Sequence, residues 1–567
     1  MITFADSAHI MRLKRILTVI LIAFASQADA QSKAFPVSTA VQRPKIVVGL
    51  VVDQMRWDYL YRYFDRYSNN GFKRLLNDGF SCENTYIPYI PTFTAIGHST
   101  IYTGSVPSIH GIAGNDWYEQ DNGYHMYCTE DSTVRSVGTT SKAGQMSPRN
   151  LLATTVTDEL KLATNFRSKV IGVALKDRGG ILPAGHSADA AYWFDDYTGN
   201  WITSTYYMSE LPEWVNAFNG QRLVDKYLTQ KWNTLYAIDT YKQSSPDNSP
   251  RYEGKFKKET APVFPHDIPV NRTSDWNTIR NTPFANTLTL DFAKAIIRNE
   301  AMGKGDQTDF LAISLSSTDY IGHQFGPNSV EVEDTYLRLD ADLATFFGYL
   351  DATFGKNQYV IFLSADHGAA HNPTFLKDHK IPAGLWSGTT GLKADISEIN
   401  GILSSKYKKD KIVRSLFNYQ VNLNYEVIEK EGLNVDEVKK DIITYYKKQP
   451  GVAFVVDLKN SGNAAIPDAL KTRIINGYNE KRSGEIQIIL NPGWYQGYGT
   501  QVTGTTHGTW NPYDTHIPLL FMGWGIKSGK SYQPYSMTDI APTIAALLKI
   551  QEPNGNIGKP IAEVLAK

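Results

Sequence analysis

Three apolar segments that each end in an aspartate constrain the fold of this chain more than any other feature. Asp53 follows IVVGLVV, Asp319 follows AISLSST and Asp366 follows VIFLSA. The β-branched residues of these segments are typical of buried strands. In an open parallel sheet, ligand sites lie at the carboxyl ends of the strands, so the three acids can converge in space. For any one of them taken alone, a turn residue or a helix cap is the commoner role.

The rest of the chain repeats this pattern of strands and helices. Further strand-like segments begin at Ser168 (SKVIGVA) and His516 (HIPLLFMG), and a helical pattern begins at Asp334 (DTYLRLDADLATFFGYLDATFG). This alternation predicts an α/β fold with a mainly parallel sheet sandwiched by helices. Residues at about 191–276 are aromatic and polar, and those at about 375–498 include the lysine-rich SSKYKKDKIVRSLF. We interpret both segments as insertions that form a cap over the site.

Residues 1–30 have the pattern of a secretory signal peptide. The basic MRLKR, which starts at Met11, precedes the apolar ILTVILIAFA and then the small residues ADA that end at Ala30. A membrane anchor is the weaker interpretation, because about 10 apolar residues are too few for a span that needs roughly 20. We predict cleavage near Ala30 and a periplasmic or secreted protein with no membrane attachment afterwards. Residues 1–10 do not fit the basic start of such a peptide, so Met11 is a candidate start of translation.

The charges and the cysteines limit the partners of the chain. Lys plus Arg and Asp plus Glu both total 57, so no net basic charge attracts nucleic acid and we expect none to bind. The chain has two cysteines, Cys82 and Cys128. In an exported protein an isolated pair is more often bridged than free, so we predict a structural disulfide. A metal site on these thiolates is the weaker interpretation, because neither has a histidine or a second cysteine at ligand spacing.

Histidines accompany two of the three aspartates. Asp319 and His323 are four residues apart, so they can share one face of a helical turn or converge from a loop, and Asp366 is followed directly by His367. A further histidine, His507, lies in TGTTHGTWNPYDTHIP. Mixed oxygen and nitrogen ligands suit zinc better than calcium, which prefers oxygen alone. With no cysteine among the ligands, the pattern indicates a catalytic rather than a structural metal site.

The segment PTFTAIGHSTIYTG, from Pro91 to Gly104, is unusually rich in hydroxyl groups. It can supply a nucleophile or simply begin a well-capped helix, and local reasoning leaves Thr92, Thr94 and Ser99 as equal candidates. No histidine base of the serine-protease kind is evident beside them. A hydroxyl nucleophile here therefore needs a metal ion to ionise it.

Motifs along nearly the whole chain are similar to those of one protein family. In chain order they are VVDQMRWDYL, PTFTAIGHSTIYTGSVPSIHGIAGN, ALKDRGG, STDYIGHQFGP, SADHGAAH, HGTWNPYDTHIP and TDIAPTIAALL. The chain resembles the alkaline phosphatase superfamily, in the branch of the nucleotide pyrophosphatases/phosphodiesterases and the phosphate-irrepressible, flavobacterial-type alkaline phosphatases. This resemblance implies an alkaline-phosphatase-like catalytic domain over residues 31–567.

The resemblance also implies a site with two Zn²⁺ ions that transfers a phosphoryl group. The implied ligands of one zinc are Asp53, Asp366, His367 and the oxygen of Thr94, the implied nucleophile. The implied ligands of the other zinc are Asp319, His323 and His507. Asn115 matches an amide that contacts a phosphoryl oxygen, and Lys176 and Arg178 match a basic pair of the flavobacterial monoesterases. Without the resemblance, KDRGG is more simply a charged turn after a strand.

A charge count favours a phosphate monoester as the substrate. Two zinc ions would be balanced by three aspartates and an ionised Thr94, which leaves the centre about neutral. A monoester dianion needs further positive charge, and Lys176 and Arg178 would supply it. We therefore predict an exported zinc phosphate monoesterase, a monomer that acts on small phosphate esters, forms a phosphothreonine intermediate and releases inorganic phosphate.

Other functions remain in competition at this stage. The runner-up is a phosphodiesterase or nucleotide pyrophosphatase on the same scaffold. Because a diester has one charge fewer and one substituent more, a diesterase would more plausibly have an apolar groove where Lys176 and Arg178 lie. A sulfatase is disfavoured, since neither CENTY at Cys82 nor CTEDS at Cys128 has the Cys-x-Pro-x-Arg pattern of that family. A secreted glycan-binding protein on a decayed scaffold is also disfavoured, because every implied ligand is present.

Overall fold

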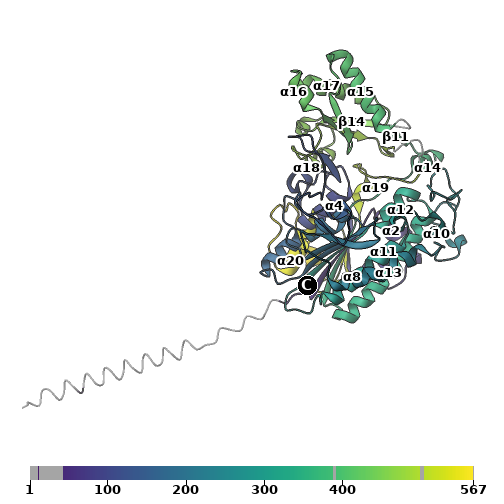
Figure 1. The fold of residues 1–567 in the computed structure, drawn as a ribbon, viewed down its shortest axis with the longest axis vertical. Coiled ribbons are helices and arrows are strands. Elements are labelled where there is room, and N and C mark those ends of the chain that lie inside the picture. The colour runs from purple at the N-terminus through teal and green to yellow at the C-terminus, as the bar shows by residue number, and fades with distance from the viewer. Residues whose placement is uncertain (1–10, 12–41, 387–390, 498–502, 566–567) are drawn as a thin grey trace, which may run out of the picture. The chain divides into compact units, whose positions relative to one another are not determined.

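The computed structural model describes Met11 and residues 42–386, 391–497 and 503–565 (Figure 1). The chain divides into two units, Met1–Arg43 and Pro44–Lys567, and the fold below is that of the second unit. Apart from Met11, the predicted signal peptide lies outside the described residues. Among the helices that the structure describes, none has the length and the apolar character needed to cross a membrane.

The core of the second unit is an eleven-stranded sheet with a parallel centre. Its central strands, in spatial order, are β18 (Leu519–Gly523), β10 (Tyr359–Ser364), β1 (Ile46–Val52), β9 (Asp309–Leu315), β6 (Val170–Ala174) and β7 (Ala190–Asp195). β1 pairs in parallel with β10 and β9, and β6 pairs in parallel with β9 and β7. β18 is antiparallel to β10. The predicted strands are all present, and the predicted mainly parallel α/β fold is confirmed.

Further strands extend both ends of this sheet. At one end β8 (Asn200–Ser204) pairs antiparallel with β7, and β5 (Ser136–Val137) with β8. At the other end β2 (Phe80–Tyr86) pairs antiparallel with β18 and with β17 (His516–Ile517), and parallel with β19 (Gly529–Ser536). β7 and β8 show that the segment at about 191–276 begins inside the sheet. Its first aromatic residues, among them Trp193 and Trp201, are buried rather than part of a cap.

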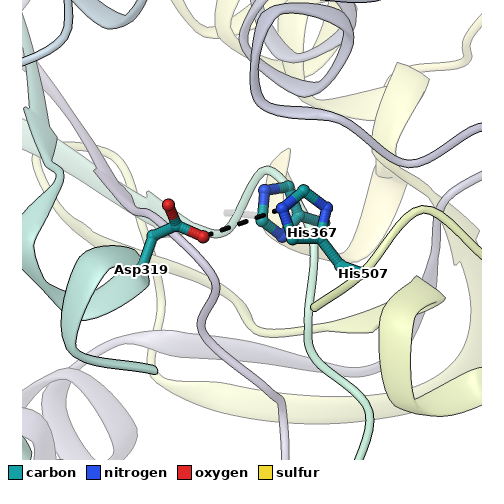
Figure 2. A group of neighbouring side chains, drawn as sticks. All are labelled: Asp319, His367 and His507. Atoms are coloured by element: carbon teal, nitrogen blue, oxygen red, sulfur yellow. Dashed lines mark ion pairs between the residues drawn. The ribbon is translucent and has the colours of Figure 1, made fainter. Parts of the chain in front are cut away.

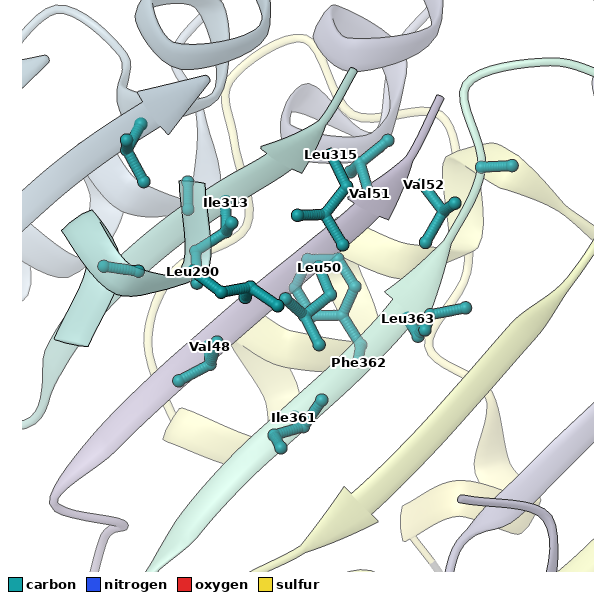
Figure 3. Packing of buried hydrophobic residues seen from close by; sticks show 14 of the residues in the cluster. Val48, Leu50, Val51, Val52, Leu290, Ile313, Leu315, Ile361, Phe362 and Leu363 are labelled. Carbon is teal, nitrogen blue, oxygen red and sulfur yellow. The ribbon is translucent and has the colours of Figure 1, made fainter. Parts of the chain in front are cut away.

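Helices cover both faces of the sheet, with α4 (Thr94–Thr103) and α20 (Ile540–Leu548) on one side and α11 (Phe284–Asn299) and α13 (Val330–Phe354) on the other (Figure 1). Every residue of β1 is therefore buried, as its uninterrupted apolar run indicates. Figure 3 shows this packing around Leu50 and Val51 of β1. A β-carbon on Gly49 would lie 2.3 Å from the Tyr102 hydroxyl, so this glycine lets α4 approach the strand closely.

The segment at about 375–498 builds a second, smaller layer. Its sheet has the order β12-β13-β15-β14, with bounds Val413–Phe417, Gln420–Leu423, Ile486–Leu490 and Val452–Asp457. Helices α15 (Gly391–Tyr407), α16 (Tyr425–Lys430), α17 (Val435–Tyr446) and α18 (Asp468–Gly477) belong to the same segment (Figure 1). The sheet has its own apolar core, which includes Val421 and Ile442. Tyr419 connects it to the site by donating its hydroxyl to the His507 carbonyl at 3.3 Å.

A buried ion pair joins the other inserted segment to α13. His266 is fully buried, and its two ring nitrogens each lie 3.1 Å from a carboxylate oxygen, one of Glu259 and one of Glu331. Burial disfavours the charged ring, but hydrogen bonds to these two glutamates outweigh it and raise the pKa of His266 to about 9. Since Glu331 lies in the first turn of α13, the charged histidine ties the segment to the main body.

The predicted disulfide is wrong, because Cys82 and Cys128 are both free and buried. Cys82 lies in β2 of the central sheet, whereas Cys128 follows β4 (His125–Tyr127), which pairs with β3 (Asp116–Tyr118) in a separate two-stranded sheet. An even number of cysteines says nothing about proximity, and a bridge requires β-carbons within about 4.5 Å. Burial raises the pKa of both thiols, so each packs as a small apolar side chain.

Candidate metal centre and nucleophile

The three aspartates at the ends of apolar segments lie side by side at one edge of the sheet. β1 lies between β9 and β10 and runs parallel to both, so the carboxyl ends of the three strands meet. Asp53 directly follows β1, and Asp366 comes two residues after β10. Asp319 lies in α12 (Ser317–Phe325), the helix that follows β9. All three side chains are buried.

The sheet edge gathers two groups of potential metal ligands. One consists of Asp53, Asp366 and His367, and the other of Asp319, His367 and His507; within each group one ligand atom per residue lies within 4.8 Å of the others. Figure 2 shows the second group, in which His507 Nε2 is 3.7 Å from Asp319 Oδ1. The rings of His367 and His507 stack with their centres 3.5 Å apart. His367 thus lies at the junction of the two groups.

The remaining two predicted ligands border these groups. His323 Nε2 lies 3.1 Å from Asp319 Oδ1, and its other nitrogen, Nδ1, lies 2.9 Å from the Thr505 carbonyl oxygen. Thr94 Oγ1 lies 3.4 Å from His367 Nε2. Since Thr94 is the first residue of α4, its hydroxyl is held at a helix N-terminus, where the helix dipole favours negative charge.

The structure distinguishes the three candidate nucleophiles, Thr92, Thr94 and Ser99, which the sequence alone could not rank. Thr92 Oγ1 donates to the Thr509 carbonyl and accepts the N–H of Gly508, so it fixes a turn. Ser99 donates its hydroxyl to the Ala95 carbonyl within α4. Among these three candidates, Thr94 alone has its hydroxyl within reach of a potential metal ligand. The N-cap residue of α4 is Phe93, so Thr94 is not the capping residue of this helix.

Two buried carboxylate oxygens of the centre, Asp53 Oδ1 and Asp366 Oδ2, have no hydrogen-bond partner. The second oxygen of each carboxylate is held: Asp53 Oδ2 accepts from Lys176 Nζ at 2.6 Å, and Asp366 Oδ1 accepts the N–H of His367 at 3.0 Å. A buried anionic oxygen without a partner is costly, and a bound cation would remove that cost. Together with the imidazoles, these free oxygens are a donor set that fits zinc.

Lys176 lies between the two groups of ligands. Its ammonium is buried and lies 2.6 Å from both Asp53 Oδ2 and Asp319 Oδ2. Burial disfavours the charge, but these two carboxylates outweigh it and raise the pKa of Lys176 above its usual value. The lysine therefore remains a cation and neutralises part of the negative charge of the three aspartates.

Arg178 lies in the first turn of α7 (Asp177–Ala184), for which Lys176 is the N-cap residue. The chain turns into this helix directly after Lys176, so the two cations do not lie in one extended segment. Arg178 Nη1 donates to the Tyr127 hydroxyl at 3.0 Å, and Tyr127 donates in turn to Asp177 Oδ1 at 2.7 Å. The Nε atom of Arg178 is buried and has no hydrogen-bond partner. The Arg178 side chain as a whole is only partly buried, so its positive charge can act on a bound anion.

Asn115 and His98 hold the N-terminus of α4. Asn115 Oδ1 accepts the N–H of Ala95 at 3.0 Å, which places this amide beside Thr94. His98 Nδ1 lies 2.9 Å from the Thr94 carbonyl oxygen, and Nε2 lies 2.9 Å from the Ser314 hydroxyl. Burial lowers the pKa of His98 to about 4, so the ring is neutral and donates to Thr94 from Nδ1. These contacts fix the backbone that carries the candidate nucleophile.

Two residues of the centre were missed by sequence reasoning. Gln54 Nε2 donates to Asp319 Oδ1 at 2.5 Å, and Tyr127 holds Arg178 as described above. Gln54 is adjacent to Asp53 in the motif VVDQMRWDYL, so its position next to a predicted ligand was a usable signal. No sequence signal pointed to Tyr127, because its partners Arg178 and Asp177 lie about 50 residues further along the chain.

The chain is similar to known proteins over most of its length. A family model described as type I phosphodiesterase / nucleotide pyrophosphatase matches residues 47–513. The chain is 59% identical over 531 residues to a Myroides odoratus protein named calcium-transporting ATPase, covering 93% of this chain and 96% of that protein. It is 52% identical over 560 residues to alkaline phosphatase PhoV of Synechococcus elongatus, covering 98% and 100%.

A further relative has a solved structure. The chain is 55% identical over 532 residues to alkaline phosphatase PafA of Elizabethkingia meningoseptica, covering 94% of this chain and 96% of that protein. The 1.7 Å crystal structure of PafA matches with a TM-score of 0.90 over 93% of this chain and 100% of that chain. The fold of this chain is therefore the PafA fold, in agreement with the resemblance noted in the sequence.

Proposed function

The chain belongs to the type I phosphodiesterase / nucleotide pyrophosphatase family and is a hydrolytic phosphoesterase, and we propose that it is a zinc-dependent phosphate monoesterase, an alkaline phosphatase. Its identity to relatives named alkaline phosphatases supports this choice over a diesterase. The observation that carries the proposal is the pair of cations at the start of α7: Lys176 is buried against Asp53 and Asp319, and Arg178 follows two residues later. A monoester dianion needs this extra positive charge, and the partly exposed side chain of Arg178 can supply it.

The residues present fit two zinc ions. Asp53, Asp366, His367 and Thr94 would hold one ion, and Asp319, His323 and His507 the other. When bound, the ions would favour ionisation of the nucleophile and neutralise charge on the leaving oxygen. Lys176, which contacts an aspartate of each set, would keep those carboxylates in place and add its charge to the site.

Thr94 is the nucleophile in the proposed reaction. Its Oγ1 attacks the phosphorus, a new P–O bond forms, and the bond to the ester oxygen breaks, so that the alcohol leaves and phosphothreonine remains. Arg178 and the Asn115 amide would hold the non-bridging phosphoryl oxygens during both steps. Water then attacks the phosphorus, the bond to Thr94 breaks, and inorganic phosphate is released. The position of Thr94 at the N-terminus of α4 favours the negative charge that passes through its oxygen.

The proposal is tested by comparing the hydrolysis of a mono-aryl and a bis-aryl phosphate. Arg178→Ala should lower kcat/KM for the monoester by about 10²–10³ and for the diester much less, because the diester has one charge fewer. An equal loss for both substrates would contradict the monoesterase assignment and favour the diesterase. Thr94→Ala should abolish turnover even when zinc is in excess, because the nucleophilic oxygen is lost. Full activity of that variant would remove Thr94 as the nucleophile.

The remaining sequence predictions belong to this proposal. The substrates are small phosphate esters, and neither nucleic acid nor, after cleavage near Ala30, a membrane is a partner. The protein acts as a monomer in the periplasm or outside the cell. Sequencing the N-terminus of the protein recovered from each cell fraction tests the cleavage and the location together, since an uncleaved cytosolic chain would contradict both.

A further inference from the structure

Gln54 occupies an unusual backbone conformation at the centre of the site. It directly follows Asp53 at the end of β1, it is 3% exposed, and its φ angle is +64°. This left-handed region is unfavourable for residues with a β-carbon other than asparagine or aspartate. The hydrogen bonds that Gln54 makes in this conformation offset the unfavourable backbone angle.

Gln54 makes one contact with each group of potential metal ligands. Its backbone N–H donates to Asp366 Oδ1 at 3.1 Å, and its side-chain Nε2 donates to Asp319 Oδ1 at 2.5 Å. An ionised carboxylate can only accept, so the amide nitrogen of Gln54 faces Asp319 and the orientation of the amide is fixed by chemistry. Asp366 and Asp319 follow β10 and β9, the strands on opposite sides of β1.

Gly322 leaves room for the other end of the same amide. It lies in α12 between Asp319 and His323, and a β-carbon on it would lie 2.0 Å from Gln54 Oε1. No larger residue fits there while the amide keeps its position. The helix that carries two potential ligands therefore also packs against the group that orients one of them.

From these contacts we infer that Gln54 is a positioning residue that fixes the Asp319 and Asp366 carboxylates relative to each other and so sets the geometry of both metal sites. Outer hydrogen bonds to ligating carboxylates orient them, and their loss typically costs about 10–100-fold in metal affinity. Gln54 differs from Lys176, which also joins the two groups, because it acts through hydrogen bonds without adding charge. The inference rests on the two-metal centre of the proposed function.

The test measures zinc binding by the full-length protein. Gln54→Met keeps the length of the side chain and removes the donor, while Gln54→Gly removes the side chain and suits the left-handed backbone. In zinc buffers that leave the wild type with two ions, both variants should hold fewer, with about 10–100-fold weaker binding of the ion at Asp319. The visible spectrum of the cobalt-substituted protein should change as well, a readout that a purely structural role would not alter.

Gly322→Ala provides the second arm, because it displaces the Gln54 amide without touching the carboxylates. It should weaken zinc binding in the wild-type background and have no further effect in Gln54→Gly. If Gln54→Met fails to fold, Gln54→Gly decides the question, with urea unfolding as the check on folding. Wild-type zinc affinity and an unchanged cobalt spectrum in the folded variants would overturn the role of Gln54. A wild-type protein that binds no zinc would instead overturn the proposed function.

Discussion

Gly97 offers a way to separate the nucleophile from the metal ligands with one methyl group. It lies in α4, three residues after Thr94 and therefore on the same face of the helix. A β-carbon on Gly97 would lie 2.4 Å from the carbonyl oxygen of Asp366 and 2.5 Å from its Cβ. Because carbon contacts are favourable only near 3.5 Å, Gly97→Ala must push α4 and Asp366 apart by about 1 Å.

The consequence for catalysis should be much larger than the consequence for folding. A displacement of about 1 Å of the reacting groups can cost about 10²-fold, so kcat/KM for a mono-aryl phosphate should fall by roughly that factor. Overpacking of this kind costs about 1–3 kcal/mol in the free energy of unfolding. That is less than the roughly 5–15 kcal/mol by which native proteins are usually stable, so the variant should fold.

Gly348→Ala is the matched control. Gly348 also lies inside a helix, α13, but nothing approaches the position of its β-carbon within 4 Å. This variant should gain about 0.5–1 kcal/mol of stability and keep the wild-type kcat/KM. Steady-state kinetics in excess zinc and urea unfolding should be measured for both variants. A Gly97→Ala enzyme within about threefold of wild-type kcat/KM would refute the claim that the close packing of α4 against Asp366 positions Thr94 for catalysis.

Three further outcomes are expected. Tyr127→Phe should lower monoester kcat/KM by about tenfold and diester kcat/KM less, because the hydroxyl that holds Arg178 is lost; equal losses would contradict this. Stability should decline by about 3 kcal/mol as the pH rises from 6.5 to 9, since the native state binds the His266 proton more tightly than the unfolded state. Urea unfolding of His266→Gln should lack this decline, and an identical pH profile would exclude His266 as its source. Thiol titration of the denatured, unreduced protein should find Cys82 and Cys128 both reactive, whereas unreactive thiols would restore the disulfide.

Much of the fold could be predicted because the relevant signals are local. A continuous apolar run such as IVVGLVV marks a strand buried on both faces, and the aspartate that follows it marks the strand end. The segment at about 191–276 was harder, because its aromatic and polar residues resemble a cap although β7 and β8 bury their tryptophans in the sheet. The disulfide prediction failed because composition gives the number of cysteines but not their separation.

The sequence by itself determined the elements and the kinds of chemical groups at this site, since the periodicity of side chains and the order of motifs are properties of neighbouring residues. The tertiary structure decided which groups meet. Only the position of β1 between β9 and β10 brings Asp53, Asp319 and Asp366 to one edge. The choice of Thr94 over its neighbours, and the contacts of Gln54 with two distant aspartates, likewise depend on hydrogen bonds across some 270 to 310 residues. Such contacts form only when the whole sheet is assembled, so no local pattern encodes them.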